Sequence, residues 1–256
     1  MAKKKPESNH PSIEEAVEAA LKSLPQKPPD SAKREPKQAY SQKVSEVLAV
    51  AYGQELRYRG MKEARPASPG ELDKSGAERR MSGGIGAKKV DVTWATEESG
   101  LLLGISLKTI NFRDQKSKNF QKNLTNRRSD MLIEAVTLHR RFPYSVLAGF
   151  LFLDKGAASD ETPRRRSTLA NTHARFKLFT GRPDPAARDE QFERLYVALM
   201  EATPFAASTE VYEVGKPDEI LPLSRVLDDL VQLVADRNPD FYECVDGRLR
   251  PLGRND

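Results

Sequence analysis

The sequence is poor in the residues that build disulfides and zinc sites. It has one cysteine, Cys244, and three histidines, His10, His139 and His173, which lie far apart in the chain. A single cysteine cannot form an internal disulfide, and residues so placed do not make the closely spaced Cys/His clusters that bind zinc. The composition therefore argues against a disulfide-stabilised fold and against zinc chemistry.

The sequence also lacks the long apolar segments of membrane proteins. No run approaches the roughly 18 apolar residues that a membrane-spanning helix needs. The basic start "MAKKKPESNHPS" is not followed by the apolar segment of a signal peptide. We therefore expect a cytoplasmic protein without a membrane partner.

The chain does contain enough apolar residues for a core, together with an excess of basic charge. Hydrophobic residues make up 38% of the 256 residues, charged residues make up 31%, and the net charge is +5. Residues 1–40 are rich in Lys, Pro, Ser and Glu, which predicts a flexible basic tail in which residues 13–24 have the spacing of a short helix. Residues 41–256 are predicted to form one domain, with its core in 41–154 and a C-terminal extension in 155–256.

The hydrophobic pattern predicts an α/β fold with a mixed central sheet flanked by helices. Two apolar runs at 90–95 and 101–110 flank a short polar turn and predict a hairpin, and the apolar run at 144–154 predicts a buried central strand. The remaining predictions are helices at 41–61, 117–142, 188–200 and 223–236, strands at 174–180 and 208–214, and loops at 63–86 and 155–167.

The predicted hairpin contains an acid and a base among apolar residues. Asp91 lies between Val90 and Val92, and Ser106 and Lys108 flank Leu107. Because side chains alternate along a strand, Ser106 and Lys108 point to one face, and antiparallel pairing brings Asp91 near them. A charge among buried residues is costly without a partner or a metal, so this pattern indicates either a structural ion pair or part of a metal-dependent hydrolytic site.

Across about Ser41 to Asp154, the order helix, aspartate strand, lysine strand, helix and strand resembles the PD-(D/E)xK nuclease superfamily, which includes many restriction endonucleases and Holliday-junction resolvases. The resemblance implies a restriction-endonuclease-like fold. It places Asp91 as the metal-binding aspartate, Lys108 as the catalytic lysine and the Leu107 carbonyl as a metal ligand. The sequence departs from the superfamily at Ser106, where the triplet normally has an acid. A second carboxylate must therefore come from another element.

Two glutamates are candidates for the missing acid. Glu55 continues the stripe of Val44, Leu48 and Ala51 on the helix at 41–61, and members of the superfamily often place a glutamate on this helix. We therefore assign Glu55, with Asp91 and Lys108, to the catalytic set. The rival is Glu134 on the following helix, because some restriction enzymes with serine in the triplet take their acid from there. Each glutamate also has a structural alternative. Glu55 would form an ion pair with a nearby arginine, and Glu134 would form an i,i+4 pair on a solvated helix face.

These residues define the expected chemistry. Asp91, Glu55 and the Leu107 carbonyl hold Mg²⁺ or Mn²⁺, which polarises the phosphodiester and helps to generate hydroxide. Lys108 orients or deprotonates the attacking water, or neutralises the charge that develops on the phosphate.

A basic segment follows the lysine strand. Asn and Gln residues are interleaved with its cations, and such side chains bind phosphates or base edges. The expected contacts to nucleic acid are Arg113, Lys116, Lys118, Lys122, Asn123, Arg127 and Arg128.

The leading hypothesis from the sequence is a metal-dependent DNA endonuclease with a role in restriction or phage defence, and a homodimer would suit double-strand cleavage. Two alternatives stay open. One is a nuclease-like protein that binds nucleic acid and whose Ser106 marks the loss of catalysis. The other is a structural reading, in which Asp91 and Lys108 form a buried ion pair and the basic segment is merely solvated.

Overall fold

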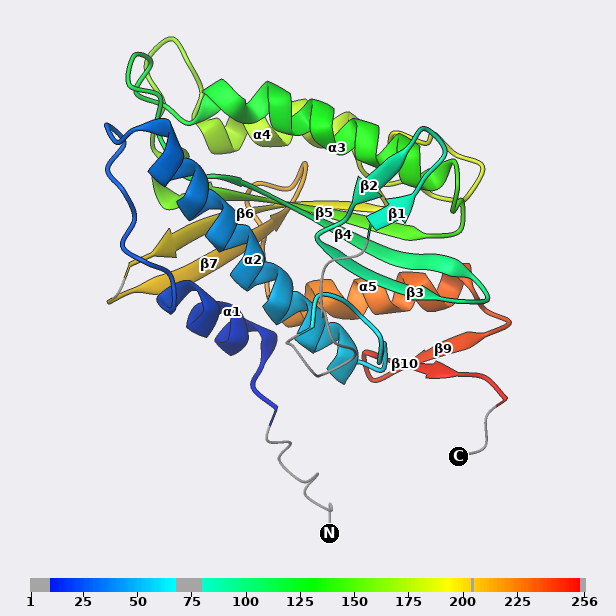
Figure 1. Cartoon of the computed structure of the whole chain (residues 1–256). Helices are drawn as coiled ribbons and strands as arrows, with labels where there is room; N and C mark the ends of the chain where they lie inside the picture. The colour runs from blue at the N-terminus through cyan, green and yellow to red at the C-terminus, as the bar shows by residue number, and fades with distance from the viewer. Residues whose placement is uncertain (1–9, 68–79, 204, 254–256) are drawn as a thin grey trace.

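The central feature of the fold is a six-stranded mixed sheet in the order β3-β4-β5-β6-β7-β8 (Figure 1). The structure, a computed structural model, describes residues 10–67, 80–203 and 205–253. Neighbouring strands are parallel in the β4–β5 and β5–β6 pairs and antiparallel elsewhere. The strands are β3 (Val92–Thr96), β4 (Gly100–Ile110), β5 (Val146–Asp154), β6 (Arg194–Ala202), β7 (Ala207–Glu213) and β8 (Ile220–Leu221).

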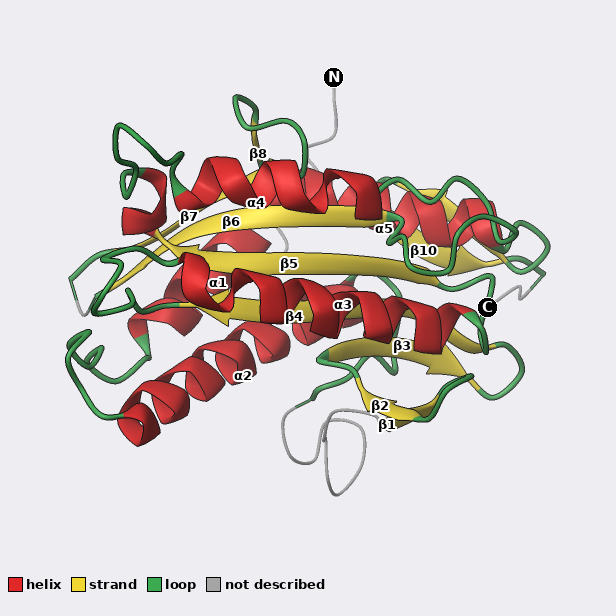
Figure 2. Cartoon of the chain, turned by 90° about the horizontal axis from the view of Figure 1, so that it is seen from above, coloured by secondary structure: helices red, strands yellow, loops and turns green. Residues whose placement is uncertain are grey.

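Helices cover both faces of this sheet. α3 (Leu124–His139) and α4 (Thr168–Phe176) lie on one face, where Figure 2 shows them from above. α1 (Ile13–Lys22), α2 (Arg34–Tyr58) and α5 (Leu223–Arg237) lie on the other face (Figure 1). Each face has its own apolar core, as expected where a largely buried sheet separates two layers. The predicted mixed sheet flanked by helices is confirmed.

The middle of the sheet follows from its sequence. All residues of β5 except the last are buried, which confirms the prediction of a fully buried strand. Gly149 in β5 has no side chain, and a Cβ atom there would collide with Met131 of α3 and Leu195 of β6. The glycine therefore lets α3 pack closely against the sheet, which fixes the position of the residues that α3 carries toward β4.

A small hairpin precedes the central sheet. β1 (Arg80–Ser82), which lies within the predicted loop at 63–86, pairs with β2 (Ala87–Lys89). Gly84 donates a backbone hydrogen bond to the Thr137 carbonyl of α3 at 2.7 Å, and a Cβ atom on Gly83 would collide with the same carbonyl. The glycines thus dock this hairpin on α3 and lead the chain directly to Asp91. Residues 68–79 of the predicted loop lie outside the described residues.

The prediction of a flexible tail is wrong for residues 10–40. Residues 1–9 of the predicted tail lie outside the described part. α1 does form, and its buried Ile13, Val17 and Leu21 join the core. α2 begins at Arg34, before the predicted start at residue 41. Residues 10–40 are therefore part of the folded domain, because α1 supplies an apolar stripe that covers α2 and β7.

Two predictions in the C-terminal part are also wrong. Residues 174–180, predicted as a strand, end α4 and continue into a 3-10 helix at Lys177–Phe179. Residues 188–200, predicted as a helix, contain most of β6. β6 lies between β5 and β7, so C-terminal residues complete the central sheet. A second hairpin, β9 (Tyr242–Val245) and β10 (Arg248–Pro251), packs against α5. Among the described residues, no helix is long and apolar enough to cross a bilayer.

Candidate active site

Asp91 lies beside the lysine strand, as the sequence predicts. Val92 pairs with Ile105, so Asp91 is next to Ser106 along the ladder. One carboxylate oxygen of Asp91 accepts a hydrogen bond from the Leu107 backbone N–H at 2.7 Å, and the same oxygen lies 3.4 Å from Lys108 Nζ. The predicted meeting of Asp91 and Lys108 is confirmed. In a strand the N–H and C=O of one residue point to the same side, so the Leu107 carbonyl also faces the Asp91 side.

Glu134 of α3 is the second carboxylate at this place. Its Oε2 lies 3.3 Å from Lys108 Nζ, so the ammonium contacts both acids. Burial raises the pKa of Glu134, and the nearby charge of Asp91 adds to the rise against the opposing effect of Lys108. Burial alone would lower the pKa of Lys108, but Glu134 and Asp91 outweigh burial and raise it. The lysine is therefore a firmly protonated cation between two acids.

The structure does not bring Glu55 to this site, which corrects the assignment made from the sequence. Glu55 belongs to α2, whose buried residues pack on the face of β4 that carries Ile105 and Leu107. Ser106 and Lys108 alternate with those residues and point to the opposite face, toward α3. Glu55 is buried in an ion pair with Arg59 at 2.7 Å and contacts His10 at 2.9 Å. The arginine-paired alternative is therefore the one that the structure supports for Glu55.

Ser106 adds a further polar atom to the site. Ser106 is 1% exposed. No group in the described part of the chain lies in good hydrogen-bonding geometry to its hydroxyl. The hydroxyl is nevertheless close enough to Glu134 to favour the charged form and so to oppose the rise in its pKa. A buried hydroxyl without a partner costs free energy, so an additional group that coordinates or hydrogen-bonds Ser106 would stabilise the site.

The donor set fits a hard divalent cation that keeps some of its water. Asp91 and Glu134 supply carboxylate oxygens, and Leu107 and Ser106 supply neutral oxygens, which are ligands that Mg²⁺ prefers. Within residues 10–67, 80–203 and 205–253, no group of three or more His, Cys, Asp or Glu side chains is arranged for a metal. Mg²⁺ sites with one or two protein carboxylates and several waters do not need such a group.

The basic segment runs from the loop after β4 into the first turns of α3. Lys116, Lys118, Lys122 and Asn123 are exposed, as nucleic-acid contacts require. Lys122 is 2.6 Å from Asp114 Oδ1, so part of its charge is already balanced. The other three expected contacts, Arg113, Arg127 and Arg128, are half-buried, and Arg127 lies 3.8 Å from Asp130.

A second basic segment, in which the sequence allows either a phosphate contact or a solvated loop, joins the first. Arg165 NH1 donates to the Ser117 carbonyl at 3.4 Å, and Gln121 Nε2 donates to the Arg166 carbonyl at 3.2 Å. Arg164 and Arg166 are exposed beside these contacts. The density of arginines was visible in the sequence, but only the fold shows that 164–166 lies beside 115–122.

Comparisons with protein-family models, with curated proteins and with solved structures give no match for this chain.

Proposed function

We propose that the protein is a metal-dependent nuclease that hydrolyses phosphodiester bonds in DNA, with a restriction-endonuclease-like core. The observation that carries the proposal is the meeting of Asp91, Glu134 and Lys108 beside the buried Ser106 hydroxyl. In this proposal the second carboxylate comes from the helix after the lysine strand, which accounts for the serine in the triplet. Cytoplasmic restriction or phage defence, by a homodimer where both strands are cut, is the role that the resemblance implies.

Each residue has a role that its position supports. Asp91 and Glu134, with the Leu107 carbonyl, would hold Mg²⁺ or Mn²⁺. The cation, when bound, polarises the phosphodiester and lowers the pKa of water. The Leu107 N–H fixes the orientation of the Asp91 carboxylate through its 2.7 Å hydrogen bond. Lys108 stays protonated, so its ammonium is suited to neutralise charge on the phosphate and to orient the attacking water.

The competing proposal is a catalytically inactive nucleic-acid-binding protein in which Asp91, Glu134 and Lys108 are a structural ion cluster. The two ion pairs of Lys108 favour this alternative. If the cluster is structural, Lys108→Met leaves two unpaired acids and destabilises the fold by about 3–5 kcal/mol. If the cluster is catalytic, the same variant loses cleavage at temperatures where circular dichroism shows it to be folded.

The direct test is cleavage. Plasmid, phage DNA and RNA are incubated with the protein and Mg²⁺, Mn²⁺ or EDTA, and the products are resolved on gels. We expect discrete DNA products with either metal and none with EDTA. DNA binding without cleavage in both metals, across all substrates, would support the inactive protein instead.

Charge reversal in the basic segment is expected to weaken DNA binding more than chemistry. The variant combines Lys116→Glu, Lys118→Glu and Lys122→Glu. Each lost phosphate contact reduces the slope of log K against log salt by about 0.9, so the slope should fall by up to about 3. Fluorescence anisotropy across a salt series measures both quantities. The matched control reverses three exposed lysines elsewhere, Lys22, Lys43 and Lys216, and an equal loss in that control would contradict the assignment.

A further inference from the structure

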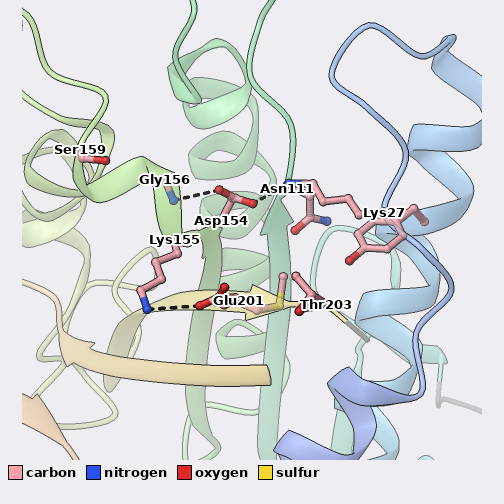
Figure 3. A pocket seen from close by; sticks show the side chains of 11 residues that line it. Lys27, Asn111, Asp154, Lys155, Gly156, Ser159, Glu201 and Thr203 are labelled. Carbon is pink, nitrogen blue, oxygen red and sulfur yellow. Dashed lines mark hydrogen bonds and ion pairs between the residues drawn. The ribbon is translucent and has the colours of Figure 1, made fainter. Parts of the chain in front are cut away.

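A polar pocket opens at the carboxyl ends of β4, β5 and β6 (Figure 3). Its volume is about 460 Å³, within the range of small-molecule sites. Asn111 follows β4, Asp154 ends β5, Glu201 lies near the end of β6, and Lys27 comes from the segment between α1 and α2. Ligands of α/β proteins bind in the crevice beyond the carboxyl ends of the parallel strands. None of these four residues belongs to the candidate active site.

Asn111 gives the pocket an unused hydrogen-bond acceptor. Its side chain is 2% exposed, and its Nδ2 donates to Ser41 Oγ at 3.1 Å. Its Oδ1 is buried and has no hydrogen-bond partner among the described residues. A buried acceptor without a donor is unfavourable, so the pocket is suited to a ligand that presents an N–H or O–H group to Asn111.

Two ion pairs line the pocket. Lys27 Nζ lies 2.5 Å from Asp154 Oδ2, and Lys155 Nζ lies 3.3 Å from Glu201 Oε2. Figure 3 shows Lys27 and Lys155 on opposite sides, with Asn111 between them. Each acid is paired with a lysine, so the two pairs together add no net charge to the pocket. Both ammonium groups are partly exposed and can contact an anionic group such as a phosphate.

An exposed aromatic residue lies two positions along the chain from a residue that lines the pocket. Thr203 lines the pocket and accepts on its Oγ1 a hydrogen bond from the Ala206 N–H at 2.9 Å. Phe205, in the turn that this bond closes, is 97% exposed. Burial of apolar surface cannot explain the position of a ring so exposed, but an exposed flat ring is suited to stacking on a nucleobase.

We propose that this pocket holds a nucleobase with an exocyclic amino group, displaced from a nucleic-acid strand. The amino group donates to Asn111 Oδ1, Phe205 stacks on the base or on its neighbour, and Lys27 and Lys155 contact the adjacent phosphates. Asn111 comes directly after the end of β4 and three residues after Lys108, a spacing of about 10 Å at the usual rise of a strand. This inference rests on the proposed function, because the proposed nuclease activity is the reason for taking the base to come from a nucleic acid.

The test measures binding without chemistry, in EDTA, by fluorescence anisotropy. Three duplexes differ at one position, which is an unpaired adenine, an unpaired purine without the 6-amino group, or a normal pair. The wild-type protein should bind the duplex with the unpaired adenine about tenfold more tightly than either of the other duplexes. A tenfold gain is near the upper end of what one hydrogen bond contributes to affinity. Free dAMP, titrated separately, distinguishes a free nucleotide from a base within a strand.

Variants assign the effect to the pocket. Asn111→Leu should abolish the preference for the amino group, whereas Asn111→Asp keeps an acceptor and should retain it. Phe205→Ala should weaken binding of the unpaired adenine about fivefold. Because the Phe205 side chain is exposed, its removal should not disturb folding. The matched control is Phe241→Ala, which removes a 54% exposed ring near β9 and should bind normally.

The outcomes separate this inference from the nuclease proposal. An Asn111-dependent preference for adenine, in the strand or as dAMP, supports the base pocket even if no metal-dependent cleavage is found. The base pocket is overturned, even if the protein cleaves DNA, by two results together. The three duplexes bind equally, and dAMP either does not bind or binds Asn111→Leu as well as the wild type. If Phe241→Ala weakens binding as much as Phe205→Ala, the stacking role of Phe205 is wrong.

Discussion

Glu134→Gln should lower the rate of metal-dependent cleavage by about a hundred- to a thousandfold, the size expected when a group that stabilises the transition state is removed. The substitution keeps the shape of the side chain but removes a carboxylate 3.3 Å from Lys108 Nζ. Mg²⁺ would then have one charged side-chain ligand, Asp91, and would bind weakly. Single-turnover cleavage and a Mg²⁺ titration measure the two losses separately.

Glu55→Gln is the matched control for this prediction. Both glutamates are 5% exposed and both lie on helices that flank β4, but they face opposite sides of the sheet. Removal of Glu55 weakens the contacts with Arg59 and His10, so we expect a loss of about 1–3 kcal/mol in stability and normal cleavage. An inactive Glu55→Gln together with an active Glu134→Gln would reverse our assignment of the second carboxylate.

The hairpin residues of the site could be predicted from the sequence because strand periodicity is strict. Side chains alternate, so a polar residue among apolar neighbours has a defined face, and one pairing register places Asp91 beside Lys108. The second carboxylate was harder to assign, because Glu55 and Glu134 both lie on amphipathic helices. The pattern shows which side of a helix is buried but not which face of the sheet the helix covers.

The two wrong elements in the C-terminal half have a physical cause. Residues 188–200, "RDEQFERLYVALM", are rich in Glu, Arg, Leu, Ala and Met, which favour helix. The apolar run at its end instead becomes β6, because it pairs with β5 and β7 and its alternate side chains enter the apolar cores on both faces of the sheet. Local preferences are small, and contacts with distant residues outweigh them.

Glu193, just before β6, is the centre of a buried ionic cluster that the sequence prediction did not include. It is 0% exposed. Its Oε1 lies 3.1 Å from Arg182 NH1 and 3.2 Å from Arg237 NH2, and its Oε2 lies 3.2 Å from His139 Nε2. The Leu147 N–H of β5 also donates to Oε2, at 2.8 Å. One carboxylate therefore connects the segment before β6 with α3, α5 and β5.

Glu193→Ala should lower the free energy of unfolding by about 3–5 kcal/mol, because it leaves the fully buried guanidinium of Arg182 without its acid. Urea denaturation measures the loss. The matched control is Glu190→Ala, which removes a partly exposed acid paired with Arg188 and should cost less than about 1 kcal/mol. An equal loss in the two variants would show that the cluster around Glu193 does not stabilise the fold.

The cluster should also give the protein a specific sensitivity to acid. Burial alone would raise the pKa of Glu193, but hydrogen bonds from His139, Leu147 and Arg182 outweigh burial and hold the pKa below its usual value. A carboxylate with a depressed pKa contributes stability that is present above its unfolded pKa of about 4.3 and is lost as the pH falls through its folded pKa. Unfolding free energies measured from pH 7 down to pH 3 should therefore fall more steeply for the wild type than for Glu193→Gln. Parallel curves for the two proteins would mean that Glu193 titrates normally and that the cluster does not favour its charged form.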